Sequence, residues 1–237
     1  MNTTMFLERA GGFFHAESRE SRSPFVLRLP PSSPFVTISR ESGSGGSSLA
    51  QLLAERLTAQ ASDGREWRVF EGNLPAKMLQ SNHLSPHLAR YLPEDHVSEI
   101  TSSIGELLGL HPSLWDLGQK MNATMRALAG EGHVILVGRG ANFATAGLAH
   151  GIHVRLIAPE LHRARFVARR YGLSEADALL HNARCNAARR RYVRDNFGAD
   201  VEDPSWYDLV INTGQVPLGD AAEVVASRVR AHAAAAA

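Results

Sequence analysis

The sequence predicts an α/β protein in which helices cover both faces of a parallel β-sheet. Five short apolar segments, rich in β-branched residues, alternate along the chain with segments of helical periodicity. One of them, residues 133–137, is an almost continuous apolar run, which is typical of a strand buried inside a parallel sheet. Strands that alternate with helices are joined by right-handed crossovers, so we expect a three-layer α/β/α domain.

One domain with an N-terminal appendage accounts for the composition. The chain has 237 residues, 44% of them hydrophobic, so residues 34–231 can bury a sizeable core. Residues 1–33 include a polar stretch without periodicity, which suggests a loose arm, and the alanine-rich tail, 232–237, carries no signal. The net charge of +1 provides no overall field that would recruit nucleic acid or a membrane. Neither is expected as a partner.

The cysteine content indicates the compartment. The lone cysteine, Cys185, excludes an internal disulfide and favours a reducing environment. No apolar run approaches the ~20 residues that a membrane span needs. We therefore expect a cytoplasmic protein, and the sequence leaves its oligomeric state open.

The first strand, expected at 35–38, leads into a glycine-rich turn and then a helix. The turn, residues 43–48, reads Gly-Ser-Gly-Gly-Ser-Ser, and leucines recur at helical spacing behind it from Leu49 to Leu57. Such a turn directs several backbone N–H groups at one point, and the helix N-terminus adds a partial positive charge. We therefore expect a phosphate to bind there. The alternative is an ordinary strand-to-helix turn whose glycines only allow a tight reversal.

This turn departs from two phosphate-binding motifs. The P-loop pattern G-x-x-x-x-G-K-[ST] requires a lysine; when the chain is laid on such a loop, Gly46 takes the lysine place and Ser48 the Ser/Thr place. The dinucleotide fingerprint G-x-G-x-x-G also fails, because Ser48 stands where its third glycine belongs. The phosphate interpretation therefore rests on the strand–turn–helix arrangement.

The middle of the chain is mostly helical. Residues 67–70 are a second strand candidate, and the pattern from Leu74 to about Leu128 is helical with several breaks. Met121 and Met125 belong to the expected buried face of its last helix.

A second unusual turn follows the strand at 133–137. Gly138-Arg139-Gly140 comes directly after it, with Asn142 close behind. An arginine between two glycines at the carboxyl end of a strand lies where open α/β sheets bind ligands. The alternative is a surface arginine in a flexible turn.

The last third supplies the remaining strands, at 152–158 and 208–213. Between them come a helix at 160–171 and a longer helix that begins with the capping box of Ser174 and Asp177. A final helix is expected from Asp220, as its cap with Glu223 at the box position, through Arg230.

The longer helix carries five arginines in eleven residues, without an acidic residue among them: Arg184, Arg189, Arg190, Arg191 and Arg194. Planar guanidinium groups bind phosphate oxygens bidentately, so this cluster favours an anionic ligand. The alternative is a solvated basic face. A phosphate turn, a second anion site and an arginine lid together indicate phosphoryl transfer between nucleotides.

The chain resembles the cytidylate kinase-like P-loop proteins, relatives of nucleoside monophosphate kinases. The resemblance covers roughly Pro34 to Ala231 and is carried by ISRESGSGG (38–46), VGRGANF (137–143), HVRLIAPELHRAR (153–165) and YDLVINTG (207–214). It implies a P-loop NTPase fold with a helical NMP-binding insertion at about 71–130 and an arginine-rich lid at about 184–204. It also implies transfer of the ATP γ-phosphoryl group, with Mg²⁺, to a pyrimidine monophosphate, for which CMP or dCMP is the expected acceptor.

The resemblance also implies roles for individual residues. Gly43, Ser44, Gly45, Gly46, Ser47 and Ser48 would hold the donor phosphates, with Ser48 near Mg²⁺. Arg139 would grip the acceptor monophosphate, with Asn142 beside it. The lid arginines, Arg189, Arg190, Arg191 and Arg194, would bind the acceptor and neutralise the transferring group.

The chain departs from cytidylate kinases at Gly46, where they carry the P-loop lysine, and at Val137 and Gly140, where they carry acidic residues. Arg40, just ahead of the loop, could supply the missing positive charge. Three functions remain open: a nucleoside monophosphate kinase, a nucleotide or anion sensor on the same fold, and a kinase for another small acceptor.

Overall fold

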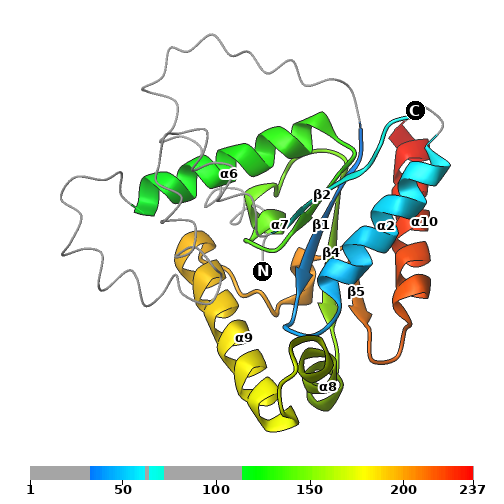
Figure 1. The fold of residues 1–237 in the computed structure, drawn as a ribbon. Helices are drawn as coiled ribbons and strands as arrows, with labels where there is room; N and C mark the ends of the chain where they lie inside the picture. The colour runs from blue at the N-terminus through cyan, green and yellow to red at the C-terminus, as the bar shows by residue number, and fades with distance from the viewer. Residues whose placement is uncertain (1–32, 62–63, 72–113, 237) are drawn as a thin grey trace.

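Five parallel strands form one sheet in the computed structural model of the protein, in the order β2-β3-β1-β4-β5 (Figure 1). The structure describes residues 33–61, 64–71 and 114–236. The strands are β1 (Phe35–Arg40), β2 (Arg68–Glu71), β3 (Val134–Val137), β4 (Gly151–Ile157) and β5 (Leu209–Asn212). Every neighbouring pair is parallel, which confirms the predicted α/β class.

Helices cover both faces of this sheet. The helices are α2 (Gly46–Gln60), α6 (Leu114–Glu131), α7 (Ala141–Ala144), α8 (Glu160–Tyr171), α9 (Glu175–Phe197) and α10 (Leu218–Ala236), with a short 3₁₀ helix, η2, at Pro204–Trp206. Helices α2 and α10 lie together on one face, and α6 and α7 lie on the other (Figure 1). The three-layer arrangement expected from the sequence is therefore present.

The alternation of side chains along β1 builds two cores. Val36 and Ile38 pack with Leu49 and Leu53 of α2, which are fully buried. Phe35 points to the opposite face and packs with Met125 of α6. Each of these side chains contributes roughly 1.5–3 kcal/mol by its burial. The predicted buried methionine face of α6 is confirmed.

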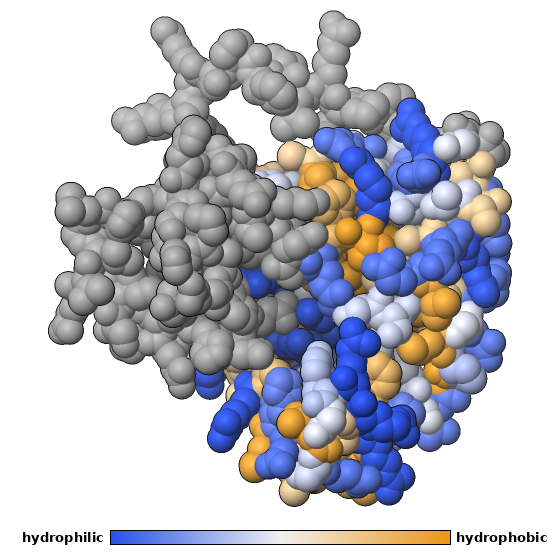
Figure 2. Space-filling view, viewed as in Figure 1, coloured by the Kyte–Doolittle hydropathy of each residue, from blue (hydrophilic) through white to orange (hydrophobic). Residues whose placement is uncertain are grey.

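The register of β1 and β3 determines where their turns lie. Ile38 is paired with Val137, and the N–H of Gly138 donates to the Ile38 carbonyl oxygen at 3.0 Å. Because the strands are parallel neighbours, the glycine turn and the arginine turn open at the same edge of the sheet. Helices α8 and α9 pack against each other at this edge, and Figure 2 shows hydrophilic and hydrophobic residues mixed over them.

Two predictions about helix ends have different outcomes. The capping box that begins α9 is confirmed in part, since the Ser174 hydroxyl accepts the Asp177 N–H at 3.1 Å. The predicted start of α10 at Asp220 is wrong. The helix begins at Leu218, because the Ala221 N–H already donates to the Pro217 carbonyl oxygen. Glu223 is consequently inside the helix, where it pairs with Arg56 and Arg230 instead of capping.

Residues 1–32 of the arm, and 72–113 of the insertion, lie outside the described residues. Helix α6, at the end of the expected insertion, packs on the sheet, and α10 continues through most of the expected tail to Ala236. Among the described residues, no helix is long and apolar enough to cross a membrane.

Candidate functional site

The glycine turn has a backbone that two of its glycines make possible. Gly43 and Gly45 have φ angles of +82° and +84°, in the left-handed region that other residues rarely adopt. Gly45 is the last residue before α2, and no side chain caps the first turn of that helix. The N–H groups at the start of a 15-residue helix therefore face the cavity beside the turn, where the helix dipole favours an anion.

Hydrogen bonds from three other elements hold this turn. The Glu41 carboxylate accepts the Ala158 N–H at 2.9 Å and pairs with Arg163 at 3.2 Å. The Thr213 hydroxyl, just after β5, donates to the Ser44 carbonyl oxygen at 2.9 Å. The side-chain oxygen of Asn186, on α9, accepts the Ser42 N–H at 2.7 Å. The turn is thus preorganised by contacts that leave its helix-side N–H groups to the cavity.

The turn cavity, a hollow of about 270 Å³ beside residues 43–48, combines backbone donors with cationic side chains. Arg40, Arg170 and Arg189 line it, as do Gly43 and the residues from Gly45 to Ser48. Ser44 is buried behind the turn, where its hydroxyl donates to the Glu41 carbonyl oxygen. Five of the six predicted phosphate residues therefore line the cavity, and Ser44 supports the turn from inside.

A hydroxyl and a carboxylate lie next to each other on the wall of the turn cavity. The Ser47 hydroxyl donates to Glu71, at the end of β2, at 2.5 Å. In the P-loop pattern the Ser/Thr directly follows the lysine place, so Ser47 and not Ser48 occupies that place. The sequence interpretation was therefore one residue out, although Ser48 also lines the cavity.

The arginine turn uses three consecutive left-handed residues. Gly138, Arg139 and Gly140 have φ angles of +78°, +57° and +66°. A non-glycine residue in this conformation costs about 1–2 kcal/mol. The Arg139 residue is also only 6% exposed. Strain of this kind persists where surrounding structure holds it and is often found at functional sites.

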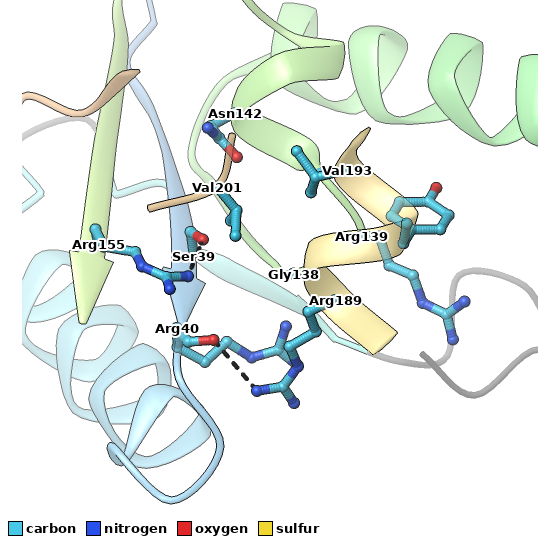
Figure 3. Close-up of a pocket in the computed structure, with 11 residues that line it drawn as sticks. Ser39, Arg40, Gly138, Arg139, Asn142, Arg155, Arg189, Val193 and Val201 are labelled. Atoms are coloured by element: carbon cyan, nitrogen blue, oxygen red, sulfur yellow. Dashed lines mark hydrogen bonds between the residues drawn. The ribbon is translucent and has the colours of Figure 1, made fainter. Parts of the chain in front are cut away.

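Beside this turn lies a narrower hollow, the arginine cavity (Figure 3). Its walls come from the ends of β1, β3 and β4 and from α9: Ser39, Arg40, Gly138, Arg139, Gly140, Asn142, Arg155, Arg189, Tyr192, Val193 and Val201. Arg155 and Ser39 lie on one side, whereas the Arg139 side chain extends away from them on the other. Four of the predicted site residues, Arg40, Arg139, Asn142 and Arg189, therefore line the arginine cavity.

Arg155 is a buried cation that sequence reasoning did not select. It is paired in register with Ser39 across β1 and β4, and its guanidinium donates to the Ser39 hydroxyl at 2.8 Å. Burial lowers the pKa of Arg155, opposed by the nearby Tyr207 and Glu41. Burial also raises the pKa of Tyr207, whose hydroxyl lies 3.3 Å from the Ser39 oxygen. This cationic wall would be stabilised by an anion in the cavity.

The arginines of α9 do not act as one group. Arg189 lines both cavities and donates to the Arg40 carbonyl oxygen at 3.2 Å, as the dashed line in Figure 3 marks. Arg190 pairs with Glu202 at 2.8 Å on the solvent side, and the side chain of Arg194 is 69% exposed. Each residue turns about 100° around a helix, so these two point away from Arg189.

Neither Arg190 nor Arg194 lines the turn cavity or the arginine cavity, so their predicted catalytic roles have no support in this arrangement and stay predictions. Arg191 also lines neither, so its predicted acceptor contact has no support in this arrangement. Arg170 lines the turn cavity from α8 instead, although nothing in its sequence context distinguished it from its neighbours.

A glycine turn behind the central strand of this parallel sheet, faced by buried and half-buried arginines, places the chain in the class of P-loop proteins, which bind phosphate groups at such a turn. The sequence confirms this class and narrows it. The chain belongs to the cytidylate kinase-like family, whose profile matches residues 35–215.

Individual relatives are more distant. The cytidylate kinase of Pyrococcus horikoshii is 25% identical over 187 residues, which make up 79% of this chain and 83% of that protein. The cytidylate kinase of Methanopyrus kandleri is 26% identical over 191 residues, or 77% and 86% of the two chains. An uncharacterized protein from Eubacterium ventriosum has the same fold, with a TM-score of 0.62 at 18% identity, over 84% of this chain and 99% of that one.

Proposed function

We propose that the protein is a nucleoside monophosphate kinase that transfers the γ-phosphoryl group of ATP to a pyrimidine monophosphate, with CMP or dCMP as the expected acceptor. The observation that carries this proposal is the pair of anion-binding turns at the ends of neighbouring strands, β1 and β3. The names of the curated relatives favour CMP among possible acceptors.

The donor would lie in the turn cavity. Its phosphates would accept hydrogen bonds from the uncapped N–H groups at the start of α2, and Arg170 and Arg189 would balance their charge. Mg²⁺ prefers oxygen ligands and is usually bound through one or two carboxylates together with substrate phosphates. The Ser47 hydroxyl and the Glu71 carboxylate fit that donor set, and both line this cavity. When bound, the ion would neutralise charge on the phosphates.

The acceptor monophosphate would lie in the arginine cavity. Arg139, Asn142 and Arg189 would bind its phosphate, as the resemblance implies, and the buried Arg155 would add a fourth contact from β4. Because Arg40 and Arg189 line both cavities, donor and acceptor phosphates would meet between them. Phosphoryl transfer depends mainly on such positioning and charge neutralisation, so the site needs no strong general base.

The first experiment is an ATP-to-ADP turnover assay with Mg²⁺ across CMP, dCMP, UMP, AMP and GMP, with an Arg139→Ala variant as the control. We expect ADP formation that depends on a pyrimidine monophosphate in the wild-type protein and is lost in the variant. Removal of one preorganised charged donor typically lowers kcat by about 10²–10³-fold. Turnover with a purine monophosphate alone would contradict the proposed acceptor.

Gly46 favours a second candidate, a sensor that binds a nucleotide without transferring its phosphoryl group. The lysine that Gly46 replaces contacts the β- and γ-phosphates in P-loop proteins. Saturable ATP binding in calorimetry, together with no turnover for any acceptor, would identify the sensor. If ATP neither bound nor turned over, the glycine turn would be only a structural turn.

A further inference from the structure

We propose that Arg40 supplies the positive charge that a lysine supplies in other P-loops, and that residue 46 is a glycine because the Arg40 side chain occupies the space above it. This inference rests on the proposed binding of ATP phosphates in the turn cavity. It identifies a further catalytic residue and explains why the turn lacks its usual cation.

The steric evidence comes from what a side chain at position 46 would meet. A Cβ atom built on Gly46 would lie 2.8 Å from Cγ of Arg40 and 3.2 Å from its Cβ. These atoms form the stem of the arginine, so they can make room only if the whole side chain rotates out of its place on the walls of the two cavities. A lysine at position 46 and an arginine at position 40 in its present place therefore exclude each other.

Backbone conformation does not require glycine at position 46. Gly43 and Gly45 have positive φ angles, whereas Gly46 does not and is the first residue of α2. The space that Arg40 takes accounts for a glycine that the backbone does not need.

The position of Arg40 suits the proposed role. It is the last residue of β1, and its side chain is 13% exposed on the walls of both cavities. Its guanidinium lies 3.8 Å from Glu71, the carboxylate that accepts the Ser47 hydroxyl. A cation at this border would meet the γ-phosphoryl group between donor and acceptor. A guanidinium can bind two phosphate oxygens at once, so it can replace the ammonium group of a lysine.

The test is an exchange of the two positions. Four proteins are compared: wild type, Arg40→Met, Gly46→Lys, and the double variant Arg40→Met/Gly46→Lys. Methionine keeps an unbranched stem but no charge; Arg68→Met serves as a matched control, because Arg68 pairs with Glu131 in solvent and lines neither cavity. The dissociation constant of MgATP is measured by calorimetry, kcat with the best acceptor by ADP formation, and Tm by thermal unfolding.

We expect Arg40→Met to lower kcat by about 10²–10³-fold, with ATP bound more weakly. Gly46→Lys alone should also impair the protein, because two cationic side chains then compete for one space. The double variant should recover at least about tenfold of what Arg40→Met loses, because methionine is flexible and has no charge to keep at the cavity wall, so its stem can rotate away from the new lysine. The control should match the wild type within about twofold.

Equal ATP affinity and turnover in wild type and Arg40→Met would overturn the inference. So would a double variant no better than Arg40→Met whose Tm equals that of the wild type. If Gly46→Lys were more active than the wild type, the space that Arg40 takes would not be the reason for a glycine at position 46, and the inference would fail. If the wild type turns over no acceptor, the proposed kinase function fails, yet ATP affinities of the four proteins still decide the role of Arg40.

Discussion

The glycine turn after β1 and the arginine turn after β3 have the same construction but different chemistry. Each follows a buried strand and ends at a left-handed glycine, Gly45 or Gly140, directly before a helix without a side-chain cap. Helix α2 continues for 15 residues, whereas α7 has only four. The first turn can therefore bind an anion through backbone N–H groups and a helix dipole, which a four-residue helix hardly possesses.

The arginine turn carries its charge on a side chain instead. Arg139 stands between two glycines in a conformation that costs stability, and its charge is directed by the turn rather than by a helix. We propose that these two neighbouring turns bind two phosphates, one through the main chain and one through a guanidinium. Three substitutions test this division.

The largest effect is expected for Gly43→Ala in the glycine turn. An added Cβ would lie 2.5 Å from the Arg163 carbonyl oxygen, and the φ of +82° disfavours alanine. The backbone must shift, so the N–H groups would lose their common direction and ATP affinity should fall by at least about 10²-fold. The control is Gly64→Ala, also at positive φ (+68°) but with no atom of the described residues within 4 Å of the added Cβ.

Both alanine variants should lose stability by about 1–2 kcal/mol from backbone strain, with a further loss for Gly43→Ala from the contact. Calorimetric titration with MgATP and thermal unfolding separate the two effects. If both variants bound ATP as the wild type does, the glycine turn would not be the donor site.

An effect of intermediate size is expected at Arg189, which lines the cavities beside both turns. Arg189→Ala removes a cation that lines both cavities, so kcat/KM should fall by about 10²-fold. Its neighbour provides the matched control: Arg190→Ala breaks a solvent-exposed pair with Glu202, worth at most about 1 kcal/mol. Steady-state kinetics give kcat/KM for both variants. Equal losses of kcat/KM would contradict this distinction and favour the arginine-rich lid expected from the sequence.

The smallest effect concerns stability at Arg139. Alanine and glycine at this position remove the same charge, but only glycine adopts φ of +57° at little cost. Arg139→Gly should therefore be more stable than Arg139→Ala by about 1 kcal/mol, while the two are equally impaired in turnover. Chemical denaturation measures the difference. An alanine variant as stable as the glycine variant would show that residue 139 carries no conformational strain.

Local patterns sufficed to predict the framework. Strand β1, the glycine turn and the β3 run are contiguous in sequence, and right-handed crossovers place such strands in a parallel sheet. The position of α10 was misjudged because Asp220 and Glu223 match a capping box that Pro217 and Leu218 pre-empt.

The side chains of the site were harder to predict. Ser39 and Arg155 meet only through the register of β1 and β4, which are 116 residues apart in sequence at this pair. Which arginine of α9 faces inward depends on the phase of the helix. Its buried face is formed by Ala178, Asn182, Cys185, Ala188 and Val193, of which only Val193 is a large aliphatic residue, so no hydrophobic stripe reveals the phase.

Arg40 and Arg189, which line both cavities, also have a thermodynamic consequence. An anion that binds in one cavity changes the charge and the hydrogen bonds that these two guanidinium groups offer in the other. The two binding equilibria are then linked, and linkage is reciprocal: the factor by which one ligand changes the affinity of the second equals the factor by which the second changes the affinity of the first. For this protein we expect that factor to differ from one, because Arg40 and Arg189 belong to the walls of both cavities.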